Sequence, residues 1–193
     1  IAYLGHIPNM TILAPKNRWE LEDMMAFAVA HNGPIAIRYP RGAVYEGLET
    51  YGDPILLGKS EAIYQESDIA ILSVGHMMET SEKVYDDLKA KGYRCSLINS
   101  RFIKPIDTAM LDTLLENHQL LVTIEDALIC GGFGESVESY VSKRNPQARV
   151  LVNGVPDQYV EHGNIPTLRK SIGLDADSIV AKIESAWDEG RKQ

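Results

Sequence analysis

The chain has 193 residues, of which 45% are hydrophobic and 24% charged, a composition typical of a globular protein with an apolar core. Its net charge of −8 argues against a nucleic-acid partner, which needs a basic face, and no apolar run approaches the roughly 20 residues of a membrane-spanning helix. Cys95 and Cys130 lie far apart without metal-ligand spacing, so we expect no disulfide framework and a cytoplasmic location.

The first 45 residues are expected to form a strand, a helix and a second strand. Met10–Ala14 is a short β-prone run, and residues 19–30 place apolar side chains at helical spacings of three and four. Asn32-Gly33-Pro34 should end that helix, and residues 35–38 should form a buried strand. Because Ile1 starts in the middle of such a pattern, we expect that it is not a natural beginning and that earlier strands belong to this sheet.

Residues 46–58 are predicted to be a linker, with Ile55–Leu57 packing down, because turn formers are frequent there and no period is sustained. From residue 59 onward, strands alternate again with helices, which predicts an α/β fold with right-handed crossovers and a mostly parallel sheet. The strands are expected at residues 60–64, 69–74, 94–99, 120–124 and 149–152. The helices are expected around residues 81–88, after Asp107 as the cap, and at residues 134–142 and 177–189.

The string Arg38-Tyr39-Pro40-Arg41-Gly42 places two guanidinium groups after a predicted parallel strand. Ligands of open α/β sheets bind beyond that end of the strands. The proline fixes the backbone and the glycine permits close approach, so Arg41 offers a rigid fork to a phosphate or carboxylate. The alternative is that one or both arginines pair with acidic neighbours, which are abundant in this chain.

A glycine-rich turn, Cys130–Gly134, lies between a predicted strand and a helix. A helix N-terminus attracts phosphate, but the turn lacks both GxGxxG spacing and the Lys-Ser/Thr of a P-loop, so we interpret it as a close-packed connection. Glu125 and Asp126 are adjacent on an extended segment and should point to opposite faces, which disfavours a shared site. No helical metal-ligand spacing relates the five histidines, which are His6, His31, His76, His118 and His162.

Short strings with a recognisable order and spacing run through essentially the whole chain. They are Ile1–Leu4, His6–Met10, Ala14-Pro15, Gly33-Pro34, Arg38–Gly42, Gly58-Lys59, Asp68–Leu72, Arg101–Asp107, Val122–Glu125, Gly131–Gly134, Gly154–Asp157 and Gly173–Asp175. With them the chain resembles the 1-deoxy-D-xylulose-5-phosphate synthase family of transketolase-type, thiamine-diphosphate-dependent enzymes. Arg38–Gly42 and Arg101–Pro105 favour that family, whereas the later strings occur in weaker form in transketolases and in 2-oxo acid dehydrogenase β subunits.

The resemblance implies a division of the chain and a reaction for the full-length enzyme. Residues 1–45 would be the last part of a pyrimidine-binding α/β domain, 46–58 a linker and 59–193 a transketolase C-terminal domain. The complete enzyme would condense pyruvate with glyceraldehyde 3-phosphate, releasing CO2, to give 1-deoxy-D-xylulose 5-phosphate for isoprenoid, thiamine and pyridoxal synthesis. The family's thiamine diphosphate and Mg²⁺ motifs are expected before Ile1, so this chain alone is expected to be inactive and to bind neither.

The resemblance carries one functional residue onto this chain. Arg41 resembles the family arginine that binds the acceptor's phosphate, whereas Arg38 is expected mainly to form a structural ion pair. The implied partners are the rest of the polypeptide, a second copy in a homodimer, and the two small substrates. The alternatives are the C-terminal part of a transketolase or dehydrogenase β subunit, the small subunit of a split enzyme, or a non-catalytic oligomerisation or anion-binding module.

Overall fold

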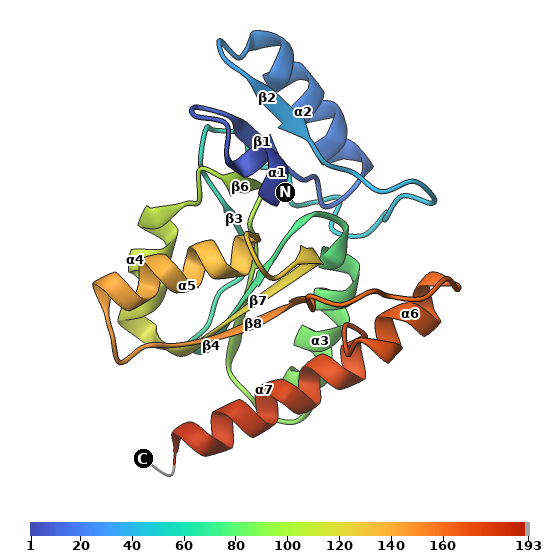
Figure 1. Ribbon diagram of the computed structural model, residues 1–193. Coiled ribbons are helices and arrows are strands. Elements are labelled where there is room, and N and C mark those ends of the chain that lie inside the picture. The colour runs from blue at the N-terminus through green and yellow to red at the C-terminus, as the bar shows by residue number, and fades with distance from the viewer. Residues whose placement is uncertain (192–193) are drawn as a thin grey trace.

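The N-terminal segment forms one parallel βαβ unit in the computed structural model, which describes residues 1–191 (Figure 1). Strand β1 (Thr11–Leu13) pairs in parallel with β2 (Ile35–Ile37), and helix α2 (Arg18–Ala30) connects them. The helix begins after Asn17, whose side chain accepts a hydrogen bond from the Glu20 amide. The expected strand–helix–strand order is confirmed, and a short helix that was not expected, α1 (Ala2–Gly5), precedes it.

The third strand of this small sheet comes from much later in the chain. Strand β6 (Phe102–Lys104) pairs antiparallel with β1, which gives the order β2-β1-β6. Such a three-residue strand, directly after another strand, has no periodic signal of its own, and the sequence pattern did not indicate it. The predicted domains 1–45 and 59–193 therefore share a sheet. Residues 192 and 193 of the second domain lie outside the described residues.

The larger sheet has five strands and is mostly parallel, as expected. Its order is β3-β5-β4-β7-β8, and only the edge strand β3 runs antiparallel to its neighbour. The strands are β3 (Glu61–Tyr64), β4 (Asp68–Ser73), β5 (Cys95–Asn99), β7 (His118–Leu128) and β8 (Arg149–Val155). All five were predicted from the sequence, with ends that differ by at most four residues because terminal residues lack the strong apolar signal of the centre.

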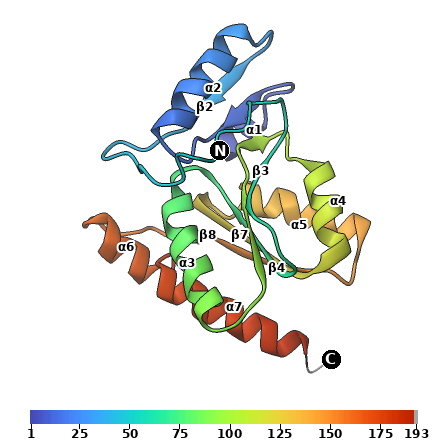
Figure 2. The same ribbon diagram turned by 180° about the vertical axis from the view of Figure 1, so that it is seen from behind.

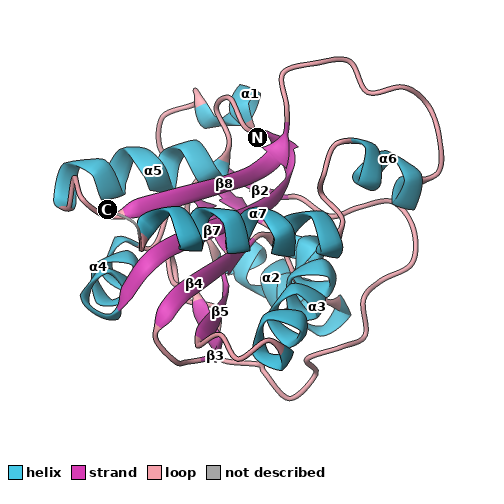
Figure 3. Cartoon of the chain, turned by 90° about the horizontal axis from the view of Figure 1, so that it is seen from below, coloured by secondary structure: helices cyan, strands magenta, loops and turns pink. Residues whose placement is uncertain are grey.

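Helices cover both faces of the larger sheet (Figure 3). The short turn η1 (Gly75–Met77) leads into α3 (Met78–Ala90), which packs with α7 (Ala176–Gly190) on one face, and α4 (Thr108–Asn117) and α5 (Phe133–Arg144) cover the other. Strand β4 serves both layers, because Ile69 and Ile71 belong to the first core and Ala70 and Leu72 to the second. Asp107 caps α4 as predicted, accepting a hydrogen bond from the Met110 amide.

One helix that was not predicted lies outside these layers. Helix α6 (Ile165–Ser171) stands beside the loop that follows β2 in both Figures 1 and 2. The sequence contains two signals for the start of this helix. Asn164 caps it by accepting a hydrogen bond from the Thr167 amide, and Pro166 occupies its first turn. Within residues 1–191 no helix is both long and apolar enough to cross a membrane.

The predicted linker contains neither helix nor strand but is partly packed. Leu48 and Tyr51, like Tyr45 just before the linker, lie against the core formed with α3 and α7, and Ile55 lies against Phe102 and its neighbours. The expectation that part of the linker packs down is confirmed, and within the run Ile55–Leu57 it is Ile55 that packs, because Leu56 and Leu57 are 60% and 53% exposed. The segment therefore follows the surface of both sheets and contacts them through single side chains.

A buried cluster of two cations and two carboxylates fastens the N-terminal segment to the larger sheet. Lys16 Nζ lies 3.0 Å from Glu20 Oε1 and 2.7 Å from Glu61 Oε2. Arg101 bonds the same two carboxylates, with Nε 2.7 Å from Glu20 Oε1 and Nη2 2.8 Å from Glu61 Oε1. All four side chains are at most 3% exposed. The Asn99 amide donates to both carboxylates, so the cluster is electrically balanced and hydrogen-bonded.

We predict that Arg101→Ala lowers the free energy of unfolding by about 3–5 kcal/mol, because it leaves two buried carboxylates facing a single lysine. Urea unfolding of this chain followed by circular dichroism measures the change. The matched control is Arg144→Ala, which removes an arginine from an exposed pair with Asp112 and should leave the midpoint nearly unchanged. Equal midpoints for the two variants would show that the cluster does not hold the sheets together.

Candidate functional site

The ends of β4 and β7 meet where the chain connections diverge. Strand β4 leads through α3 to β5 on one side, and β7 leads through α5 to β8 on the other. Such a switch point opens a crevice at the carboxyl ends of the strands, the usual ligand position in open α/β sheets. His76 follows β4 at this point, and Glu125 and Asp126 lie near the end of β7. Three titratable side chains therefore gather at the place where the fold favours a ligand.

Arg38, from the end of β2, enters this crevice and occupies it. Its Nη1 donates to Asp126 Oδ1 at 2.5 Å, and its Nη2 donates to the Asp126 carbonyl at 3.2 Å. His76 Nε2 lies 3.0 Å from the other carboxylate oxygen. Burial alone would raise the pKa of Asp126, but the hydrogen bonds from His76 and Arg38 outweigh it and hold that pKa well below its usual value. The structural ion pair expected for Arg38 is therefore present.

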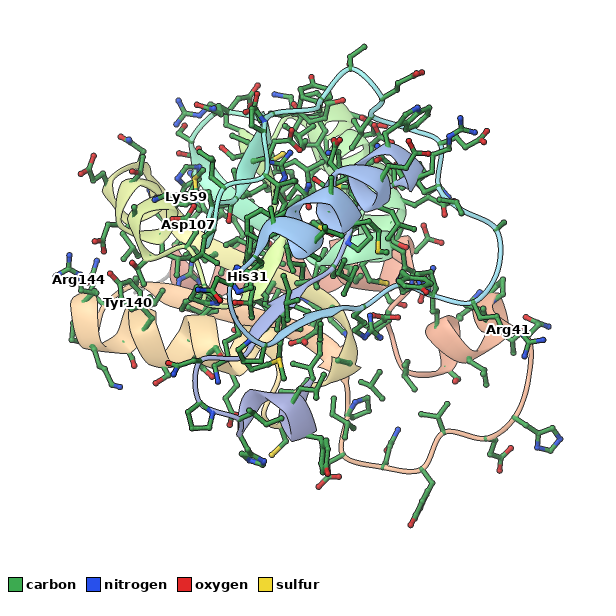
Figure 4. The ribbon with its side chains drawn as sticks, turned by 90° about the horizontal axis from the view of Figure 1, so that it is seen from above. His31, Arg41, Lys59, Asp107, Tyr140 and Arg144 are labelled. Carbon is green, nitrogen blue, oxygen red and sulfur yellow. The ribbon has the colours of Figure 1, made fainter. Side chains whose placement is uncertain are left out.

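Arg41 takes a different position from Arg38. It is exposed, and it lines a cleft of about 470 Å³ together with His76 and residues of α3 and α6. Figure 4 shows Arg41 on the α6 side of the molecule, well away from Lys59 and Asp107. Gly42 next to it has φ +140°, a backbone conformation that favours glycine, so the turn that carries Arg41 depends on this residue. The guanidinium group is thus presented to solvent at the mouth of a cleft.

The glycine-rich turn holds a carboxylate of the chain itself. Glu125 is fully buried, and its two oxygens accept hydrogen bonds from the Phe133 amide at 3.0 Å and the Gly134 amide at 2.8 Å. These amides form the N-terminus of α5, the position at which a phosphate would otherwise bind. A side chain at position 132 would collide with the Glu125 carboxylate, so this position requires glycine. The interpretation as a close-packed connection holds, and Glu125 and Asp126 serve different networks.

A second concavity of about 390 Å³ lies between β3 and α4, on the other side of the sheet. It contains the buried pair Ser96 and His118, with Ser96 Oγ 2.9 Å from His118 Nε2. The other ring nitrogen lies 2.9 Å from the Leu114 carbonyl, and burial lowers the pKa of His118. Because Ser96 also accepts a hydrogen bond from the Glu66 amide, the polar atoms of this pair are satisfied internally, as in an ordinary buried network.

Comparison with known proteins identifies the larger unit. The family described as "Transketolase, C-terminal domain" matches residues 58–179, more than half of the chain. The chain belongs to the transketolase C-terminal domain family. A solved structure described as a split-gene transketolase, inactive β4 tetramer, superposes on the chain with a TM-score of 0.88 at 25% identity. The superposition covers 97% of this chain and 60% of that one, so the five-stranded sheet has the fold of the transketolase C-terminal domain. A transketolase of Campylobacter jejuni shares the fold with a TM-score of 0.63 at 14% identity, covering 95% of this chain and 27% of its own.

Two curated relatives of this transketolase C-terminal domain protein share one name. A protein of Lachnoclostridium phytofermentans named 1-deoxy-D-xylulose-5-phosphate synthase is 42% identical over 95% of this chain and 29% of its own length. A protein of Aquifex aeolicus with the same name is 36% identical over 99% of this chain and 30% of its own. The chain therefore spans about 30% of the length of the curated relatives it matches.

The described residues of this transketolase C-terminal domain protein were compared with the requirements of a metal site. Within residues 1–191, no three His, Cys, Asp or Glu side chains are grouped so that they would hold a metal ion. The carboxylates at the switch point are already bonded to Arg38, His76 and the α5 amides. We therefore assign no reaction step of thiamine diphosphate or Mg²⁺ to the described residues.

Sequence analysis missed the roles of two residues at the switch point. His76 and Asp126 each lie two residues beyond the end of a predicted parallel strand. That position was the available signal, because the carboxyl ends of parallel strands meet at one edge of the sheet. Their partner Arg38 is 88 residues from Asp126, and no local pattern connects the two.

We predict that Glu125 makes the chain less stable as pH rises through neutrality. Burial raises the pKa of Glu125 from its usual value near 4.5 to about 7, against the lowering effect of the Gly134 and Phe133 amides. The folded chain then keeps a proton that the unfolded chain has released, so the free energy of unfolding falls between pH 4.5 and 7, by up to about 3 kcal/mol.

Glu125→Gln, which mimics the protonated form, should remove this dependence. Urea unfolding from pH 4.5 to 8 measures the free energy of unfolding. Relative to the native chain, the stability of the variant should increase as pH rises. Glu138→Gln, at an exposed position of α5, is the control and should follow the native chain. If the difference between Glu125→Gln and the native chain is the same at every pH, the carboxyl group does not titrate as predicted.

Proposed function

We propose that this chain is the C-terminal part of a 1-deoxy-D-xylulose-5-phosphate synthase. The complete enzyme would condense pyruvate with glyceraldehyde 3-phosphate and release CO2, forming 1-deoxy-D-xylulose 5-phosphate for isoprenoid, thiamine and pyridoxal synthesis. The observation that carries the proposal is the similarity of nearly the whole chain to synthases of that name, at 42% identity for one of them. The split-gene transketolase resembles the chain in fold at a lower identity of 25%.

The rest of the polypeptide is expected to supply the reactive centre. Thiamine diphosphate and Mg²⁺ would be held outside this chain, with residues 1–45 as the last part of the pyrimidine-binding domain, 46–58 as the linker and 59–193 as the C-terminal domain. We infer a homodimer in the cytoplasm. The reducing compartment is supported by two free cysteines, Cys95 buried and Cys130 exposed. The described domain would contribute packing and one contact with the acceptor.

That contact is assigned to Arg41, as the group that binds the acceptor's phosphate. It lies in the loop after the parallel strand β2, is exposed, and has no carboxylate within 4.0 Å among the described residues, whereas the nearby Arg38 is paired with Asp126. A planar guanidinium group donates two parallel hydrogen bonds to a phosphate. Because the phosphate is remote from the reacting aldehyde carbon, this contact would position the acceptor and take no part in bond making.

The function is tested by an acceptor screen with the complete enzyme that contains this sequence. Thiamine diphosphate, Mg²⁺ and pyruvate are supplied, and D-glyceraldehyde 3-phosphate is compared with D-glyceraldehyde. The expected result is 1-deoxy-D-xylulose 5-phosphate, with a strong preference for the phosphorylated acceptor. Ketol transfer between sugar phosphates would instead indicate a transketolase, and the absence of any carboligation would indicate a non-catalytic module.

We predict that Arg41→Ala in the complete enzyme raises the KM for D-glyceraldehyde 3-phosphate about 10- to 100-fold. Hydrogen bonds to charged groups contribute about 1.5–3 kcal/mol, and each 1.4 kcal/mol is a factor of ten. Pyruvate decarboxylation and the use of unphosphorylated glyceraldehyde should be nearly unchanged, since neither needs the phosphate contact. Steady-state kinetics with both acceptors measures the difference, and Arg144→Ala on the outer face of α5 is the control. An unaltered KM for the phosphorylated acceptor would remove Arg41 from the site.

A further inference from the structure

The cleft beside Arg41 is built from three segments that lie far apart in the sequence. The loop after β2 contributes Arg41, helix α3 contributes Thr80 and Lys83, and helix α6 contributes Arg169. Figures 1 and 2 both show α6 on the side of the molecule where the loop after β2 runs. Arg41 and Arg169, which are 128 positions apart, therefore line one cleft of about 470 Å³.

The acidic side chains of this cleft already have partners. Glu79 pairs with Lys83 one helical turn away, at 3.1 Å. Asp175 caps α7, where it accepts hydrogen bonds from the Ser178 amide at 3.2 Å and the Ser178 hydroxyl at 2.6 Å. Both carboxylates are thus held by groups of their own segments, and neither neutralises an arginine of the cleft.

The two arginines of the cleft differ from the paired arginines elsewhere in the described chain. In a chain of net charge −8, Arg38, Arg101 and Arg144 each lie against a carboxylate. Within residues 1–191, neither Arg41 nor Arg169 has a carboxylate within 4.0 Å. Asp175 keeps its charge, because its partners are neutral, but the cations Arg41, Lys83 and Arg169 outnumber the carboxylates Glu79 and Asp175 in the lining, and the net positive charge favours an anion.

The side chain of Arg169 is held in place by neutral contacts. Its Nη1 donates to Thr80 Oγ1 at 3.4 Å, and Thr80 is only 7% exposed. Its backbone carbonyl accepts a hydrogen bond from the Leu174 amide at 2.8 Å, which fixes the end of α6. Because a hydroxyl group orients the guanidinium group without cancelling its charge, the other N–H donors of Arg169 keep their capacity for an anion.

We propose that Arg169 is a second arginine for the acceptor's phosphate and forms a two-arginine clamp with Arg41. The inference rests on the proposed function and extends it, because it adds to the site a residue of α6, which was not foreseen as an element. A phosphate dianion has three terminal oxygens, so it accepts parallel hydrogen bonds from one guanidinium group and still has capacity for another. Thr80 is then the residue that positions the clamp.

The clamp is tested in the complete enzyme with two independent measurements. The first is the KM for D-glyceraldehyde 3-phosphate and for D-glyceraldehyde. The second is the affinity for inorganic phosphate, measured by isothermal titration without pyruvate, which does not depend on catalysis. Arg169→Ala is expected to raise the first KM about 10-fold or more, to leave the KM for D-glyceraldehyde nearly unchanged and to weaken phosphate binding similarly.

Four further variants separate the clamp from a structural role. Lys170→Ala, at the adjacent exposed position of α6, should leave both measurements unchanged. Arg169→Lys keeps the charge but loses the fork, and Thr80→Val removes the orienting hydroxyl, so both should give intermediate affinities. In the double variant Arg41→Ala with Arg169→Ala, the loss of phosphate affinity should be smaller than the sum of the losses in the two single variants, since either change alone already breaks the clamp. Melting temperatures close to the native value establish that the variants are folded.

The outcomes distinguish this inference from the proposed function. If the native enzyme forms no deoxyxylulose phosphate, yet phosphate binding falls in Arg169→Ala and Arg41→Ala but not in Lys170→Ala, the clamp stands and the proposed function fails. If product forms and Arg169→Ala behaves like Lys170→Ala in both measurements, the clamp is wrong and the function stands. A native enzyme that binds no inorganic phosphate also overturns the clamp.

Discussion

The arrangement of the molecule depends on the buried cluster of Lys16, Glu20, Glu61 and Arg101. Removing such charges from water is costly, and the cost is offset only when each charge keeps its partner in good geometry. Lys16 and Glu20 belong to the N-terminal unit, and Glu61 and Arg101 to the larger one, so the two units satisfy each other. The linker also takes part, because the Asp53 amide donates to Glu61. A pair of units joined in this way has one relative orientation, and that orientation determines where the loop after β2 meets α3 and α6.

The same orientation explains why the usual ligand position of the fold is closed. At the switch point of the larger sheet, Arg38 bonds Asp126 beside His76, and a second carboxylate, Glu125, occupies the N-terminus of α5. A doubly wound sheet normally leaves both positions to ligands. Here residues of the chain itself fill them, so the open cleft lies farther out, at Arg41. Two arginines three residues apart thus have different environments: Arg38 is paired and holds the strand end in place, whereas Arg41 is exposed.

The fold was largely predictable because its main elements have strong apolar periods. Strand β4 and helix α7 were both recognised, the latter from the spacing of Ile179, Val180, Ile183 and Trp187, which are buried together. For the candidate site, the sequence offers one local signal, the short string that contains Arg41, whose role in phosphate binding is a proposal. The buried charge cluster and the position of Arg169 depend on contacts between residues tens of positions apart, which no local pattern encodes. Arg101 was noticed as part of a motif, but its partners became visible only in three dimensions.

Strand β6 has a consequence for how this protein can be divided. It follows Arg101 in the larger unit, yet among residues 1–191 its only sheet neighbour is β1 of the smaller one. A cut at residue 58, where the family match begins, would respect the linker but split a sheet and leave β6 with an open edge. The two units therefore share a sheet across the domain boundary and are not separable modules. Swapping this C-terminal unit between related enzymes would require complementary residues on both sides of the boundary, in β1 and in the partners of Arg101.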